Sequence, residues 1–138
     1  MILLDANILI RAVLGRRRVR YLLDEYSSRG VRFFAPEVAF QDAEKYLPPL
    51  LEKRGKPASD VLPALHYLRQ IIEIADRDLY AAFEHDARER LRGRDEHDWP
   101  VLASALALSC PIWSEDADFF GASRFGPLTA LKSFLRAN

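Results

Sequence analysis

Short apolar runs separated by helical patterns are the feature that most restricts the fold of this chain. The runs fall at Ile2–Leu4, Val31–Phe34, Ile71–Ala75 and Ile112–Trp113. A continuous apolar run of this length is typical of a strand covered on both faces, as in a parallel sheet. The segments between the runs are long enough for the crossovers that parallel strands require. We therefore expect an α/β fold, a three-layer α/β/α sandwich with a parallel sheet of four to five short strands.

The helical segments show apolar residues at helical spacing, with glycine or proline near several of their ends. They are expected at Asn7–Leu14, Arg17–Arg29, Pro36–Leu47, Asp60–Arg69, Asp76–Leu91, Asp98–Ser109 and Thr129–Arg136. Pro48 and Pro49 are expected to end the third helix, because proline lacks the backbone donor that a helix interior needs. The run Ile71–Ala75 is also consistent with an extension of the helix before it. A chain of 138 residues has the length of one domain, so residues 1–138 are treated as a single unit.

The composition excludes several classes of protein. A hydrophobic fraction of 49% and a charged fraction of 29% are typical of a globular protein with a core. Cys110 is the sole cysteine, which excludes an internal disulfide and a multi-cysteine metal site, and it is expected to be a small buried side chain. The sequence has no apolar run of the ~20 residues that a membrane helix needs. No basic stretch precedes the first strand, so we expect no signal peptide and a cytoplasmic protein.

Carboxylates occupy the places where a parallel sheet gathers its ligands, beyond the carboxyl ends of the strands. Asp5 directly follows the first strand, and Asp116 follows the last strand after two intervening residues. Asp98 opens the apolar helix that leads to that last strand, and Glu44 lies within the third helix. Converging carboxylates repel one another unless a cation neutralises them, and oxygen-only ligands suit Mg²⁺ or Mn²⁺. The pattern therefore indicates metal-dependent phosphate-ester chemistry.

Each of these acids also has a purely structural interpretation. Asp98 is placed to cap its helix, Asp116 and Asp118 are ordinary turn residues, and Glu44 resembles a surface glutamate. Asp5 is the hardest to explain without a site, because a carboxylate at the end of a buried strand costs free energy unless something pairs with it.

Blocks of sequence around these acids carry a family resemblance. They are Ile2–Asn7, Pro36–Val38 with Glu44–Leu47, Asp95–Ala103 and Ile112–Phe119. Taken together and in this order, they resemble the PIN-domain family of metal-dependent ribonucleases, which includes the toxins of VapBC-type toxin–antitoxin pairs. The resemblance implies a parallel sheet of order 3-2-1-4-5, with the acids lining a cleft at its C-terminal edge.

The resemblance also implies roles for individual residues. The catalytic, metal-binding acids would be Asp5, Glu44, Asp98 and Asp116, with Asp118 as a further metal ligand and Asn7 and Ser114 orienting the acids or the water. Two positions stay open, since Asp95 is an alternative to Asp98 and Asp42 is an alternative to Glu44. Asp42 and Glu44 lie two residues apart and therefore on roughly opposite faces of a helix.

The function that this resemblance implies is a Mg²⁺- or Mn²⁺-dependent endoribonuclease that hydrolyses RNA phosphodiester bonds, as the toxin of a toxin–antitoxin pair. Its partners would be RNA, an antitoxin protein and a second copy of the chain. Leu47–Leu51, Leu62 and Leu65 are the expected apolar surface of such a homodimer. The alternative is a non-catalytic PIN-like scaffold that binds RNA or a partner protein. Like charges gathered in one cleft argue against the scaffold, because a binding module has no need of them.

A basic cluster near the N-terminus is the expected RNA contact. Residues 1–34 contain seven arginines against three acids, although the chain as a whole has no net charge. The cluster Arg16, Arg17, Arg18 and Arg20 is expected to hold RNA phosphates. The structural alternative is a solvated helix start, although basic residues there oppose the helix dipole.

Overall fold

The computed structural model describes residues 1–15 and 17–114 of the chain. The elements, with η for a short 3-10 helix, are β1 (Ile2–Leu4), α1 (Ala6–Val13), α2 (Arg17–Ser28), β2 (Phe33–Pro36), α3 (Glu37–Lys53), η1 (Ala58–Asp60), α4 (Val61–Ile71), β3 (Ile72–Ala75), α5 (Arg77–Tyr80), η2 (Ala81–Phe83), α6 (Glu84–Arg90), η3 (Glu96–Asp98), α7 (Trp99–Leu108) and β4 (Ile112–Trp113). The expected helix Thr129–Arg136 lies outside the described residues.

The strands form one parallel sheet of order β3-β2-β1-β4, which confirms the predicted α/β fold and agrees with the implied order over the described strands. The second strand begins two residues later than predicted, because the Val31 N–H bonds to the carbonyl of Tyr26 at the end of α2. That hydrogen bond, 2.9 Å long, commits Val31 to the turn between helix and strand. At its other end β2 continues to Pro36, which pairs with Ala75 of β3.

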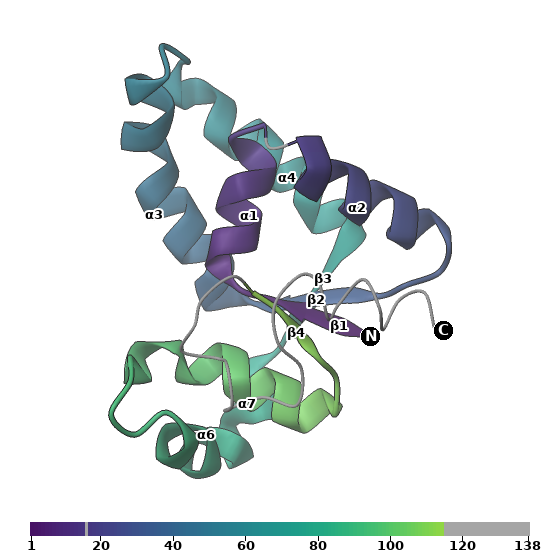
Figure 1. Cartoon of the computed structure of the whole chain (residues 1–138), viewed down its shortest axis with the longest axis vertical. Coiled ribbons are helices and arrows are strands. Elements are labelled where there is room, and N and C mark those ends of the chain that lie inside the picture. Colours follow the sequence, from purple (N-terminus) through teal and green to yellow (C-terminus); the bar gives the residue numbers. More distant parts are fainter. Residues whose placement is uncertain (16, 115–138) are drawn as a thin grey trace.

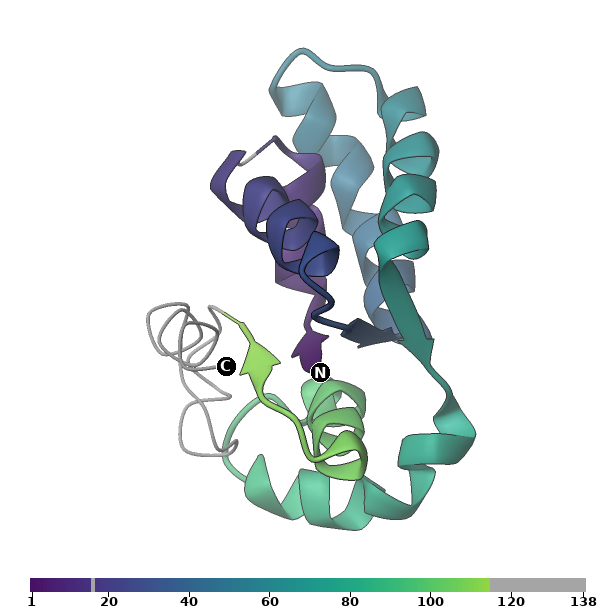
Figure 2. The ribbon, with the colours of Figure 1, turned by 90° about the vertical axis from the view of Figure 1, so that its right-hand side faces the viewer.

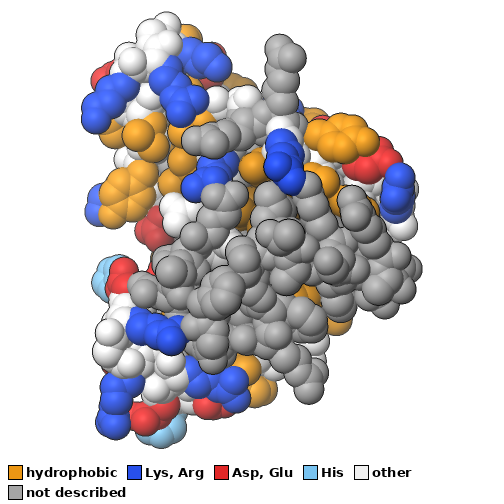
Figure 3. Space-filling model, viewed as in Figure 1, with side chains coloured by type: hydrophobic (Ala, Val, Ile, Leu, Met, Phe, Trp, Pro, Cys, Tyr) orange, Lys and Arg blue, Asp and Glu red, His pale blue; other side chains and the backbone are white. Residues whose placement is uncertain are grey.

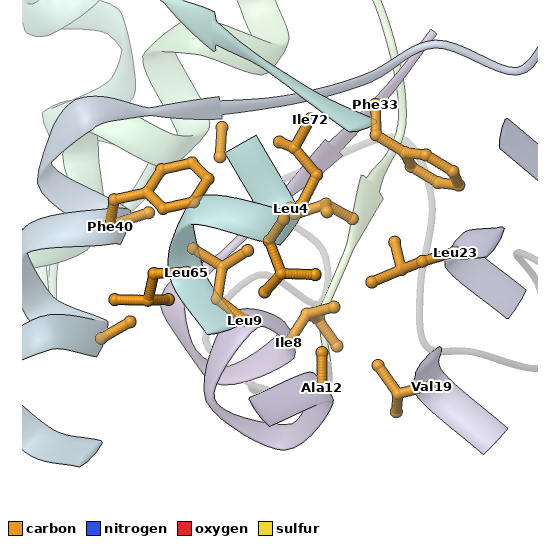
Figure 4. Packing of buried hydrophobic residues seen from close by; sticks show 14 of the residues in the cluster. Leu4, Ile8, Leu9, Ala12, Val19, Leu23, Phe33, Phe40, Leu65 and Ile72 are labelled. Carbon is orange, nitrogen blue, oxygen red and sulfur yellow. The ribbon is translucent and has the colours of Figure 1, made fainter. Parts of the chain in front are cut away.

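Alternating strand residues separate two apolar cores, one on each face of the sheet. Ile2, Leu4, Phe33 and Trp113 belong to the core that α1, α2, α3 and α4 cover, and Figure 4 shows part of that packing. Leu3, Phe34 and Ile112 point to the opposite face and pack with residues of α6 and α7. Figure 1 shows the corresponding helices above and below the sheet. The sheet is therefore the middle layer of a three-layer sandwich.

Helix α3 continues through Pro48 and Pro49, although the sequence predicts that it ends at Leu47. Leu47 before the prolines and Leu51 after them are both buried, so one continuous apolar face holds the two parts together. The prolines remove two backbone donors, but Glu44 and Lys45, whose carbonyls lose these donors, are exposed to water. Tertiary packing thus overrides the local signal.

The predicted helix Asp76–Leu91 is broken into α5, η2 and α6. Tyr80 is buried edge-to-face against Trp99 at 5.6 Å between ring centroids, and Ala87 packs into the same core. Because of the break, α5 and α6 can both pack against α7. A single straight helix of this length would lose contact with α7 toward one of its ends.

Helices α3 and α4 form a pair that projects from the sheet (Figures 1 and 2), and we call this pair the arm. Arg69 on α4 binds Glu37 on α3 through two hydrogen bonds of 2.7 and 3.0 Å, and its guanidinium stacks on Phe40. Leu47, Leu51 and Leu65 are buried in the core, so they do not form the exposed surface expected for a homodimer, whereas Leu62 is 62% exposed. The homodimer itself stays a prediction.

Cys110 is buried in the core beneath α7, as expected from the sequence. Burial raises the pKa of its thiol to about 11, so the side chain stays protonated and apolar at neutral pH. Within the described part of the chain, no helix has the length and apolar character needed to cross a membrane.

The continuation of α3 through its prolines gives a stability prediction. Pro49 is exposed, and proline within a helix costs about 3 kcal/mol relative to alanine, of which about 1 kcal/mol returns through the stiffer unfolded chain. Pro49→Ala is therefore expected to raise the free energy of unfolding by about 1–2 kcal/mol, measured by urea denaturation. Pro63→Ala is the matched control, because Pro63 lies in the first turn of α4, where proline is tolerated. Destabilisation by Pro49→Ala would contradict this account of α3.

Candidate functional site

Asp5 is the central residue of the candidate site, and the end of the sheet determines its position. Leu4 pairs with Trp113, so the residues that follow them, Asp5 and Ser114, emerge side by side at the carboxyl ends of β1 and β4. One carboxylate oxygen of Asp5 accepts the Ile8 N–H at 3.1 Å, which makes Asp5 the N-cap of α1. Its other oxygen accepts a hydrogen bond from the Ser114 hydroxyl. Asp5 is only 4% exposed, so these contacts hold a buried carboxylate in one orientation.

Asp98 and Asp95 differ in what their carboxylates do. Asp95 is exposed and accepts the His97 N–H at 3.0 Å, so it caps the short helix η3. Asp98 is half-buried at the N-cap position of α7, yet its carboxylate accepts no hydrogen bond from the first turn of that helix. The side chain of Asp98 therefore does not cap α7 as the sequence suggests, and the side chain that acts as a cap in this region is that of Asp95, which caps η3. Asp98 precedes the N-terminus of α7, where the helix dipole favours a negative charge.

On α3, the two alternative acids lie on different sides of the helix. Arg69 of α4 has a raised pKa, caused first by its hydrogen bond to Glu37 and to a smaller extent by the charge of Glu44. Glu37 and Glu44, seven residues apart, share one face of α3, and this face is turned toward α4. Asp42 is five residues from Glu37, a rotation of ~140°, and therefore lies away from α4.

The contact that distinguishes these two acids is not visible in the sequence, because Arg69 lies 32 positions from Glu37 in the chain. Glutamates seven residues apart on one helix share their environment, and a single arginine on the next helix can engage both. Asp42 is half-buried and Glu44 is exposed, a difference that no local pattern marks.

The structure brings Asp5 and Ser114 together but does not complete a metal centre. Within residues 1–15 and 17–114, no three His, Cys, Asp or Glu side chains lie close enough to hold a metal ion. Asp116 and Asp118 lie outside the described residues, and Asn7 is an exposed residue in the first turn of α1. The donors at hand are carboxylate oxygens, one of them buried and oriented, and this chemistry fits Mg²⁺ or Mn²⁺ rather than a softer metal.

One face of the molecule is concave. Figure 3 shows a hollow at the left, between the arm above and the α6–α7 layer below, with acidic side chains on both of its sides. Concave surfaces are the usual places for ligands.

The basic cluster near the N-terminus is only partly described. Arg16 and the side chain of Arg17 lie outside the described residues, and Arg18 is exposed. Arg20 stacks over the ring of Tyr67 at 4.4 Å, and the Tyr67 hydroxyl donates to Asp24 at 2.7 Å. This hydrogen bond is the main cause of a raised pKa of Tyr67. Arg20 thus takes part in the contact between α2 and α4, and RNA binding by this cluster stays a prediction.

Comparison with known proteins identifies the family. The family model described as PIN domain matches residues 3–125, from β1 to beyond β4, and therefore most of the chain. Neither the curated proteins nor the solved structures yielded a match. PIN domains are generally nucleases, which agrees with a buried, oriented carboxylate at the carboxyl end of β1. The chain belongs to the PIN-domain family, and its function is of the nuclease type.

Proposed function

We propose that this protein is a metal-dependent endoribonuclease that hydrolyses RNA phosphodiester bonds with Mg²⁺ or Mn²⁺. The observation that carries the proposal is the buried Asp5 carboxylate, oriented by the Ile8 N–H and the Ser114 hydroxyl where β1 and β4 end. A carboxylate held in this way in a PIN domain is prepared for a ligand, because its orientation is fixed before the ligand arrives.

The residues proposed to hold the metal are Asp5, Asp98, Asp116 and one acid of α3, with Asp118 as a further ligand. When bound, such an ion would stabilise the charge that develops on the phosphodiester and would lower the pKa of a water molecule toward neutral pH. The chain supplies the orientation. The backbone of α1 and the Ser114 hydroxyl fix Asp5, and the start of α7 favours the ionised form of Asp98.

For the acid of α3 we favour Asp42 over Glu44. Glu44 shares its face with Glu37 and interacts with the Arg69 charge, which directs it toward α4. Asp42 is half-buried on another side of α3, away from Arg69. A carboxylate that faces an arginine is a poorer candidate for a metal ligand than one that does not.

The narrower role is the toxin of a toxin–antitoxin pair, with an antitoxin protein and a second copy of the chain as partners. This role rests on the family resemblance, and the nuclease proposal does not depend on it.

The first test is cleavage of a labelled, structured RNA pool in Mn²⁺, Mg²⁺ or EDTA by the parent and by Asp5→Asn. Cleavage is expected only with metal, and the variant is expected to cleave at least about 100-fold more slowly. The reason is that even residues that only hydrogen-bond to a metal ligand change metal affinity or activity by ~10–100-fold. Asparagine is also a good N-cap, so α1 should remain capped and the thermal midpoint should change little. Equal cleavage in EDTA would overturn metal dependence. A folded parent that cuts nothing in either metal would favour the non-catalytic scaffold.

The second test separates the two acids of α3 by paired substitutions that remove charge but keep shape. Asp42→Asn is expected to reduce the cleavage rate by at least about 10-fold, and Glu44→Gln by less than about 2-fold. The same RNA and metal concentrations serve for both variants, so each is the control for the other. The opposite ranking would assign the site acid to Glu44.

The third test concerns Ser114, which is buried and donates to Asp5. Ser114→Ala is expected to weaken the apparent affinity for Mn²⁺ by about 10–100-fold, because the carboxylate loses the donor that orients it. The dependence of the cleavage rate on Mn²⁺ concentration measures this shift, and Ser114→Thr, which keeps a hydroxyl, should restore part of it. An unchanged Mn²⁺ dependence in folded Ser114→Ala would show that Ser114 has no positioning role.

A further inference from the structure

The outer part of the arm carries basic side chains that the rest of the structure leaves available. Residues 45–56 contain Lys45, Lys53, Arg54 and Lys56 against the single acid Glu52. All four cations are exposed, and within the described part of the chain none of them takes part in an ion pair. Figure 3 shows basic side chains gathered over this end of the arm. A local surplus of positive charge in a chain of zero net charge is a binding surface for an anion.

Several arginines elsewhere are engaged by neighbouring acids, as Arg88 is by Glu84, Arg90 by Asp86 and Arg32 by Glu73. Such pairs leave little net field for a partner.

An exposed aromatic side chain lies next to one of these cations on α3. Tyr46 is 51% exposed on α3, and the Lys45 ammonium is 5.4 Å from the centre of its ring. Tyr46 follows Asp42 by four residues, so the two side chains occupy the same face of α3. That face lies away from α4, which the opposite face meets through Glu37.

The outer end of the arm is tied to the end of α1, the helix that Asp5 begins. Arg54 donates to the carbonyl of Leu14 at 3.3 Å, and a Cβ atom on Gly15 would lie 3.7 Å from the Lys56 ammonium. Arg54 and Lys56 therefore lie near the end of α1 that is opposite Asp5. Eight residues of α1 span ~12 Å, which sets the scale of the path from these cations to the carboxylate.

We propose that Lys45, Tyr46, Lys53, Arg54 and Lys56, here called the arm track, bind an unpaired stretch of the RNA substrate beside the bond to be cut. The proposal rests on the proposed function and names its substrate class as RNA with unpaired bases. The cations contact phosphates, and the exposed Tyr46 ring stacks on a base, a contact that requires no particular sequence. In a duplex the bases are paired and stacked on one another, so Tyr46 finds no exposed base face there.

The test is RNA binding without metal, so that it does not depend on cleavage. The probe is a fluorescein-labelled RNA of about 12 nucleotides without self-complementarity, measured by anisotropy in EDTA. Tyr46→Ala is expected to weaken binding about 5- to 150-fold, and Tyr46→Phe, which keeps the ring, to bind like the parent. Tyr21→Ala is the matched control, because Tyr21 is 62% exposed on α2, outside the arm track, and its loss should change little.

The phosphate contacts are tested through the salt dependence of the same binding. Lys45→Gln with Lys53→Gln is expected to reduce the slope of log affinity against log salt by about 1.4, at about 0.7 per phosphate contact. Arg90→Gln with Arg92→Gln removes the same charge from the region of α6, where both arginines are paired, and should leave the slope nearly unchanged. The same RNA annealed to its complement should bind with no dependence on Tyr46.

The outcomes separate this proposal from the nuclease proposal. Tyr46-dependent binding of single strands supports the arm track even if no cleavage is ever observed. Metal-dependent cleavage with equal binding by the parent, Tyr46→Ala and Tyr21→Ala would overturn the arm track and leave the nuclease intact. Equal losses in Tyr46→Ala and Tyr21→Ala, or no binding of the probe by the parent, would also overturn it.

Discussion

The hydrogen bonds of Asp5 are the interaction on which the rest of the site depends. One residue joins the end of β1, the beginning of α1 and the residue after β4, although Asp5 and Ser114 are 109 positions apart in the chain. A buried carboxylate costs free energy unless its oxygens are satisfied, so its presence requires both partners to be in place. The parallel pairing of Leu4 with Trp113 provides this, because it brings the two strand ends to the same edge of the sheet. Stability and site geometry are thus served by the same contacts.

The second determinant is the arm, in which contacts between α3 and α4 fix the orientation of α3. The two hydrogen bonds between Arg69 and Glu37, with the guanidinium stacked on Phe40, fix one face of α3 against α4. The pair is partly exposed, so its direct contribution to stability is small, and the buried Leu47 and Leu51 hold the helix in place. The pair fixes the rotation of α3 about its own axis relative to α4. With Glu37 and Glu44 turned toward α4, Asp42 and Tyr46 lie on a side of α3 that is turned away from α4.

The net charge of zero does not show how unevenly the charged residues are distributed over the chain. The chain has twenty basic and twenty acidic residues, which by itself argues against binding a polyanion. Most described ion pairs are local, within one helix or between neighbouring elements, and they cancel charge where they occur. The end of the arm is different, because its basic residues have a single acid among them. A neutral protein can therefore present a basic surface at one end and an acidic hollow nearby.

The sequence by itself determined the layer architecture, the approximate position of each described strand and the placement of Asp5 after the first of them. These follow from patterns within a few residues, since short apolar runs and helical spacing are local signals. The tertiary structure alone decided that α3 continues through Pro48 and Pro49 and that residues 77–90 form separate short helices around α7. It also decided that Glu37 and Glu44 share the face of α3 that meets α4, and that the cations at the outer end of the arm stay outside the ion pairs of the described residues. The physical reason is that these outcomes depend on contacts between residues distant in the chain, whose energies outweigh local preferences that favour another arrangement.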